Sequence, residues 1–224
     1  MLIRQCPDLR ELSILTQGPE PIDARMLFSG NHWPNLGSLE LGNVTVDSAV
    51  SSDDDAHPFI SFLSEHNHLR TLRLSGDFTL SSTHFARLPR DSLQDLRCFC
   101  GSIDHLSSLP SAKSLLSMEI PNPLVLREVT PLAISHALQA APAVRSLKVS
   151  FVLQSGYDGF GILRSIATAG AHIKHLDLTF SHKPSFYLVC WFGYPECMRF
   201  IKVLSPSYRK CSRGRSGLSR SSGL

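Results

Sequence analysis

Apolar residues recur along the chain in a short phrase whose first, fourth and sixth positions are apolar. The first copy is residues 9–14, LRELSI. Six further copies have apolar residues at Leu36/Leu39/Leu41, Leu69/Leu72/Leu74, Leu93/Leu96/Cys98, Leu115/Met118/Ile120, Val144/Leu147/Val149 and Ile173/Leu176/Leu178. Apolar residues that alternate with polar ones are typical of a strand with one buried face. The pattern therefore predicts seven short strands.

Several segments between the phrases have the features of helices. Thr130 and Pro131 supply an N-cap and a proline at the first helical position, and the apolar residues that follow have near-helical spacing. Asp158 and Gly170 are expected to begin and end the next helix. Further helices are expected around residues 59–63, 23–29 and 83–88, and residues 102–109 are expected to form a single helical turn.

The phrases begin at residues 9, 36, 69, 93, 115, 144 and 173, so successive repeats are 22 to 33 residues long. A helix between two strands supplies the crossover that parallel strands need. Repeats of this length with this phrase are typical of leucine-rich repeats. The predicted fold class is α/β, a leucine-rich repeat solenoid shaped as a horseshoe. Parallel strands would line its concave face and helices its convex face.

Residues 1–180 are expected to form this domain, with about seven repeats and no cap at either end. Either another domain precedes it or the chain is a fragment. Residues 181–224 lack the repeat, and aromatic residues crowd their first half without a period. From about residue 205 the Ser- and Arg-rich composition predicts a disordered tail.

Composition narrows the class of protein without naming a function. The chain has 224 residues, 42% of them hydrophobic and 18% charged, as in an ordered domain. A net charge of +3 is too small to indicate nucleic acid, which is therefore not the expected partner. Six cysteines without a regular framework, no signal peptide and no apolar run of spanning length favour a cytoplasmic or nuclear protein without a membrane segment.

The polar positions of the phrase are expected to face the concave surface. The position between the last two apolar residues holds Arg97 in the fourth copy, in one row with Arg73 and Glu119. The predicted partner-binding residues are Glu40, Arg70, Arg73, Arg97, Glu119, Arg145, Lys148 and Asp177. This moderately basic surface would suit an acidic peptide or protein. The alternative is a solvated face whose charges pair with each other, each exposed pair contributing about 0–1 kcal/mol.

The sequence predicts no catalytic, cofactor-binding or metal-binding residues. His66 with His68, and Cys98 with Cys100, have ligand-like spacing but no second pair at a suitable distance. Residues 156–161 (GYDGFG) lack the lysine of a phosphate-binding loop. The chain is therefore interpreted as a non-catalytic protein–protein interaction module. A truncated fragment without independent function is the alternative, and a hydrolase or metal-dependent enzyme on a loop is a less favoured one.

A proline two residues before the first apolar position recurs in CPDLRELSI, WPNLGSLEL and APAVRSLKV. These phrases resemble the irregular leucine-rich repeats of fungal F-box proteins. The resemblance implies the substrate-recognition part of a ubiquitin ligase adaptor, with an F-box upstream recruiting the ligase scaffold; no F-box pattern lies in this chain. One departure is that Val44, Asp77 and Val152 stand where the repeat usually has asparagine.

Overall fold

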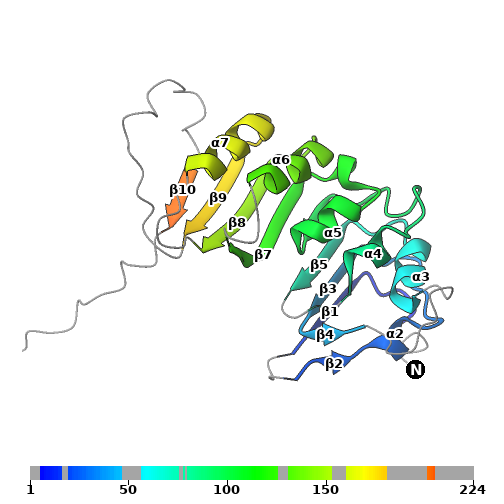
Figure 1. Cartoon of the computed structure of the whole chain (residues 1–224). Helices are drawn as coiled ribbons and strands as arrows, with labels where there is room; N and C mark the ends of the chain where they lie inside the picture. The colour runs from blue at the N-terminus through cyan, green and yellow to red at the C-terminus, as the bar shows by residue number, and fades with distance from the viewer. Residues whose placement is uncertain are drawn as a thin grey trace, which may run out of the picture.

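The chain is described by a computed structural model at residues 6–16, 20–46, 57–75, 78, 80–125, 131–152, 160–180 and 201–204. Within those residues, eight strands form one parallel sheet in the order β1-β3-β5-β6-β7-β8-β9-β10 (Figure 1). Their bounds are Glu11–Leu15 (β1), Ser38–Gly42 (β3), Thr71–Ser75 (β5), Cys98–Cys100 (β6), Ser117–Val125 (β7), Ser146–Val152 (β8), His175–Phe180 (β9) and Ile201–Leu204 (β10). The short strands β2 (Ile22–Asp23) and β4 (Val44–Thr45) pair with each other.

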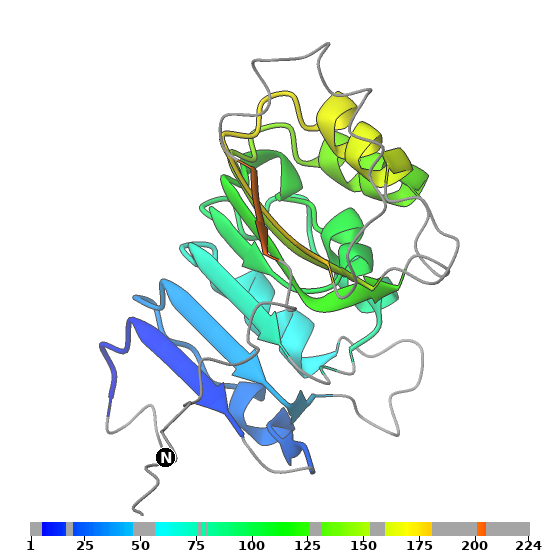
Figure 2. The same ribbon diagram turned by 90° about the vertical axis from the view of Figure 1, so that its left-hand side faces the viewer.

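Helices connect the strands and lie along one face of the sheet, as Figures 1 and 2 show. Their bounds are Arg25–Phe28 (α2), Pro58–Glu65 (α3), Ser82–Phe85 (α4), Ile103–Ser108 (α5), Pro131–Ala140 (α6) and Phe160–Ala169 (α7), with a 3₁₀ turn at Ala112–Ser114 (η1). The expected α/β alternation with parallel strands is confirmed. The expected single turn at 102–109 is a six-residue helix, because Ser102 caps it by accepting a hydrogen bond from the His105 amide.

The strands stack in register, with one repeat beside the next. Leu39 of β3 lies opposite Leu12 of β1 and Leu72 of β5, and all three face the helices. The residue just before each strand continues the ladder. For example, the carbonyl of Arg70 accepts hydrogen bonds from the amides of Arg97 and Cys98 at 2.8 and 3.0 Å. Each repeat thus contacts chiefly its neighbours, as its sequence period implies.

The fourth repeat is placed three residues later than its sequence indicates. The expected apolar residues of this repeat were Leu93, Leu96 and Cys98. In the structure Phe99 lies opposite Leu72 and Met118, which hold the second apolar position of their phrases, so Leu96 holds the first apolar position of the fourth phrase. Leu93 is buried but precedes the strand in a left-handed conformation with φ of 56°. The expectation that Cys98 faces the core is wrong, since Phe99 does so and the alternation of a strand puts Cys98 on the opposite face.

The correct register has glycine where the neighbouring strands have a second apolar residue. A Cβ added to Gly101 would lie 2.6 Å from Cζ of Phe99. The Phe99 ring therefore occupies the space that a second branched side chain would need. One large residue and one glycine replace two medium-sized residues, and the core stays filled.

The longer helices begin and end close to the expected residues. Pro131 is the first residue of α6, and α7 ends at Ala169, directly before Gly170. Helix α3 is capped by His57, whose Nδ1 accepts a hydrogen bond from the Phe59 amide at 3.2 Å. Asp158 and Thr130, the expected N-caps of α7 and α6, lie outside the described residues.

Strand β10 pairs in parallel with β9, so the sheet includes four residues beyond the expected domain limit at residue 180. No copy of the apolar phrase marks this strand in the sequence. Residues 181–200 and 205–224, which include the expected disordered tail, are outside the described part of the chain. Among the described helices, none has the length and apolar character needed to cross a bilayer.

Candidate functional site

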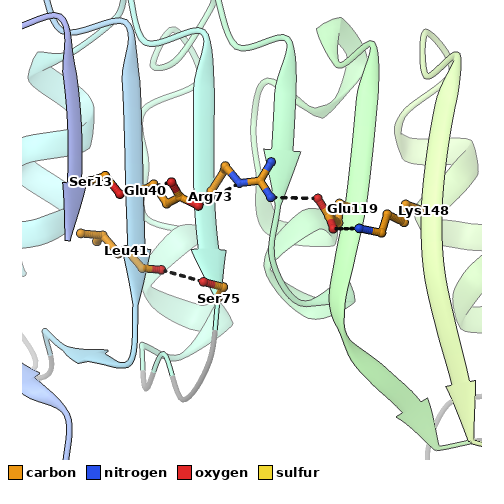
Figure 3. Close-up of polar contacts among 7 residues, drawn as sticks. All are labelled: Ser13, Glu40, Leu41, Arg73, Ser75, Glu119 and Lys148. Carbon is orange, nitrogen blue, oxygen red and sulfur yellow. Dashed lines mark hydrogen bonds and ion pairs between the residues drawn. The ribbon is translucent and has the colours of Figure 1, made fainter. Parts of the chain in front are cut away.

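Among the described residues, no helix covers the second face of the sheet. This face carries a row of side chains, most of them polar, one from each of the seven strands between β1 and β9 in the sheet order. Alternation along each strand puts these residues opposite the buried leucines. The register aligns them as Ser13, Glu40, Arg73, Cys100, Glu119, Lys148 and Asp177, which we call the central row. Figure 3 shows five of them pointing toward one another across the strands.

Ser13 and four of the charged members of the central row form a continuous chain of contacts. Ser13 Oγ donates to Glu40 at 3.2 Å, and Glu40 accepts from Arg73 Nε at 3.2 Å. Arg73 Nη2 then reaches Glu119 at 3.0 Å (Figure 3). Lys148 Nζ donates to the other oxygen of Glu119 at 2.6 Å. The mutual pairing considered from the sequence is therefore present for these charges.

Glu119 is the centre of this chain of contacts. Its side chain is 22% exposed, and burial alone would raise the pKa of its carboxyl group. The hydrogen bond and charge of Lys148, with those of Arg73, more than offset burial and hold the pKa below its ordinary value of 4.5. Arg73 and Lys148 are 42% and 58% exposed, so each ion pair contributes about 0–1 kcal/mol.

Cys100 lies in the row between Arg73 and Glu119, and the bond between those two side chains spans its position. Burial raises the pKa of the thiol to about 11, and the charge of Glu119 acts in the same direction. A thiol needs to ionise to act as a nucleophile or metal ligand. Cys100 is consequently an inert, packed residue in this arrangement.

A second set of charges stands where the strands begin. Each of the seven strands that carry the central row is preceded by one residue of a second series. In strand order these residues are Arg10, Gly37, Arg70, Arg97, Leu116, Arg145 and Lys174. We call its five cations, all exposed, the basic edge: Arg10, Arg70, Arg97, Arg145 and Lys174. The placement of Arg97 beside Arg73 and Glu119 was therefore wrong. The three-residue shift of the fourth repeat moves Arg97 to this edge, and Cys100 takes its place in the central row.

The eight predicted binding residues thus fall into two groups. Five belong to the central row, whereas Arg70, Arg97 and Arg145 belong to the basic edge. Asp177 Oδ1 is buried and has no hydrogen-bond partner in the described part of the chain; the backbone register pairs its residue with residue 202 of β10. Lys174 and Leu116 were not selected from the sequence, although they occupy the same position of the phrase as Arg70.

The described residues contain no group of three or more His, Cys, Asp or Glu side chains placed to hold a metal ion. A cavity lies among apolar side chains of β7, β8, α5 and α6, including Met118, Leu147 and Ala137. Its volume of about 10 Å³ is enough for about one water molecule. What the described arrangement offers chemically is a broad polar face rather than a pocket for a small molecule.

Comparison with protein-family models and with curated proteins gave no match for this chain.

Proposed function

We propose that the chain is a non-catalytic leucine-rich repeat module that binds a protein partner on the exposed face of its sheet. The observation that carries this proposal is the continuous row of polar side chains across neighbouring strands. Such a face can contact an extended stretch of a partner without any pocket. It needs no chemical step and no bound group.

The solenoid assignment within this proposal is supported by topology. In the eight-stranded sheet, each strand from β1 to β8 pairs in parallel with the strand of the next repeat, and the phrase recurs in each repeat, with glycine at its last position in the fourth. Repeats stacked in this way commonly curve because strands and helices differ in width. A horseshoe with the central row on its concave face is the shape we propose.

A narrower proposal follows from the resemblance to fungal F-box proteins. In such a protein the exposed face of the sheet would recognise the substrate of a ubiquitin ligase. Recruitment of the ligase would then require an F-box that is not part of these 224 residues. The charged central row would provide specificity more than affinity, because charges across an interface mainly exclude wrong partners.

Blocking the face with bulky side chains tests the proposed function. Ser117 and Ser146 are half-buried residues of neighbouring strands β7 and β8 and lie directly opposite each other. Affinity capture from cell extract with quantitative mass spectrometry should show specific proteins that are lost with Ser117→Trp and Ser146→Trp. Gln139→Trp, on the exposed side of α6, is the matched control and should retain them. If all three variants capture the same proteins as the native chain, the face is not the binding surface.

A further inference from the structure

We infer that the basic edge and the small residues beside it bind an acidic, extended segment of a partner protein that runs across the strands. The inference rests on the proposed function and names the class of partner. It concerns a different part of the face from the central row, whose charges already pair with each other.

The residues that precede the strands form a continuous backbone series, in which Gly37 and Leu116 stand between the cations of the basic edge. The amides of Arg97, Leu116, Arg145 and Lys174 each donate to the carbonyl of the preceding member of the series at 2.7–2.8 Å. Neighbouring members therefore stand about one strand spacing apart, roughly 4.8 Å. No ion pair joins any of the five cations to an acidic side chain among the described residues. Asp95, two residues before Arg97, contacts His68 instead, at 3.1 Å.

Two of the guanidinium groups are held in the same way. Arg97 Nη1 donates to the carbonyl of Ser114 at 3.3 Å, and Arg145 Nη1 donates to that of His172 at 3.2 Å. Ser114 lies two residues before Leu116, and His172 lies two residues before Lys174, so both arginines contact the equivalent carbonyl of the next repeat. A guanidinium has five N–H donors, so most of them stay available for carboxylates. The backbone contact orients each group in advance, which lowers the entropy lost on binding.

Small side chains flank the basic edge on the side of the central row. They are Ser38, Thr71, Cys98, Ser117 and Ser146, one on each strand from β3 to β8. On β5, β7 and β8 larger side chains stand on both sides of these small residues, so the row provides a path for a backbone. From β3 to β8 the path measures about 19 Å at roughly 4.8 Å per strand. About six extended residues cover that length.

Leu116 interrupts the cations at the middle of the edge, between Arg97 and Arg145. Its side chain is 46% exposed, one of the few large apolar side chains with such exposure. A partner segment with an apolar residue between acidic ones would match the order of cation, leucine and cation on this edge. The complementary segment is therefore acidic with a central apolar residue.

A nucleic acid fits this face less well than an acidic peptide does. Glu40, Glu119 and Asp177 stand on the same face and would repel a run of phosphates. Neither the basic edge, the small residues nor the central row contains Phe, Tyr or Trp on which bases could stack. Carboxylates spaced along a peptide can meet the cations and avoid the acidic positions.

Fluorescence anisotropy on the full chain tests the inference with a labelled peptide of six glutamates and a central leucine. Binding should weaken at least about fivefold with Arg97→Glu and further with Arg70→Glu added, and should fall as NaCl rises from about 50 to 300 mM. Arg164→Glu, on the exposed side of α7, makes the same charge change away from the edge and should alter the affinity less than about twofold. If the Arg97→Glu variant does not fold, Arg97→Gln replaces it in the binding measurement, because it removes the charge but keeps an N–H donor. Leu116→Ala should weaken this peptide but not one with serine at its centre.

Four results would overturn the inference. They are absence of binding, equal binding of a lysine peptide of the same length, an equal effect of Arg164→Glu, and tighter binding of oligothymidylate at the same residues. The two proposals fail in different ways. If capture of partners is lost with Ser146→Trp and unchanged with Arg97→Glu, the proposed function stands and the acidic partner is rejected. If neither substitution changes capture, the proposed function is itself rejected.

Discussion

His66 and His105 are buried imidazoles that the fold holds in the neutral form. His66 Nε2 accepts a hydrogen bond from the Trp33 amide at 3.0 Å, so the proton is on Nδ1, which donates to the carbonyl of Phe62 at 2.6 Å. His105 Nε2 donates to the carbonyl of Leu80 at 2.7 Å. Burial disfavours the charged form and lowers the pKa of both residues below the ordinary 6.5.

These lowered pKa values predict that the chain loses stability in mild acid. Well above pH 6.5 both histidines are neutral whether the chain is folded or unfolded, so there they add no pH dependence. Below 6.5 the unfolded chain takes up protons that the folded chain does not. The free energy of unfolding should then fall by up to about 1.4 kcal/mol per pH unit for each histidine. Urea unfolding between pH 7.5 and 5.5 measures the slope.

His105→Gln should make that slope shallower, because the replacement does not titrate. His136→Gln, on the exposed side of α6, is the control and should keep the native slope. Glu119 contributes only at lower pH, since its pKa is lowered from 4.5 and its stabilisation is lost as pH falls below that value. A free energy of unfolding that stays constant down to pH 5.5 would contradict the assignment of the two histidines.

At the scale of single elements, the fourth repeat shows how a strand can be misplaced from its sequence. Leu93/Leu96/Cys98 fits the phrase better than Leu96/Phe99/Gly101, because glycine is not an apolar side chain. The decisive fact is spatial: the Phe99 ring fills the room of two side chains. No local pattern contains that information.

Truncation of Phe99 should distinguish the two placements of this repeat. Phe99→Ala removes a side chain that is 2% exposed and should lower the free energy of unfolding by about 3–5 kcal/mol. Cys98→Ala changes a half-buried residue on the other face and should cost less than about 1 kcal/mol. Denaturant unfolding of both variants is the measurement. A larger loss for Cys98→Ala would restore the register inferred from the sequence.

Two glycines at the opposite ends of α7, Gly161 inside the helix and Gly170 directly after it, should respond oppositely to alanine. Gly161 is exposed near the start of α7, and among the described residues a Cβ there would meet only Cγ of Pro131, at 3.9 Å. Gly161→Ala should therefore stabilise the chain by about 0.5 kcal/mol through reduced freedom of the unfolded state. At Gly170 a Cβ would lie 2.7 Å from the carbonyl oxygen of Ile166 and 2.5 Å from Ile173.

Gly170→Ala should consequently destabilise by about 1–3 kcal/mol, since a backbone atom has to move. Thermal unfolding of the two variants beside the native chain gives both signs in one experiment. Equal changes in stability at the two positions would show that the contacts around the end of α7 do not determine the effect of alanine at Gly170.

At the scale of the whole molecule, burial is uneven along the stack. In β1 the apolar residues Leu12 and Ile14 are only partly buried, and Leu15 is 57% exposed. In β3 and β5 the equivalent leucines are at most 3% exposed. Because each repeat contacts chiefly its neighbours, stability can differ from one repeat to another.

Hydrogen exchange should reveal this gradient. Amides of β1 should exchange faster than those of β3, β5 and β7, by at least about tenfold if local opening is easier by about 1.4 kcal/mol. Mass spectrometry of peptic fragments after timed exchange measures the difference. Uniform protection across these strands would indicate that the stack opens only as a whole.

The sequence by itself determined the α/β class, the parallel order of the repeats and most of the buried leucines. These features could be predicted because each repeat carries their signals locally. The phrase marks the buried face of each strand, and the distance to the next phrase leaves room for a crossover helix. Only the tertiary structure decided the register of the fourth repeat, the position of Arg97 and the pairing of Glu119 with both Arg73 and Lys148. Those features depend on which side chains share space across strands. Residue 119 follows residue 73 only after α4, β6 and α5, and residue 148 follows residue 119 only after a further helix, α6.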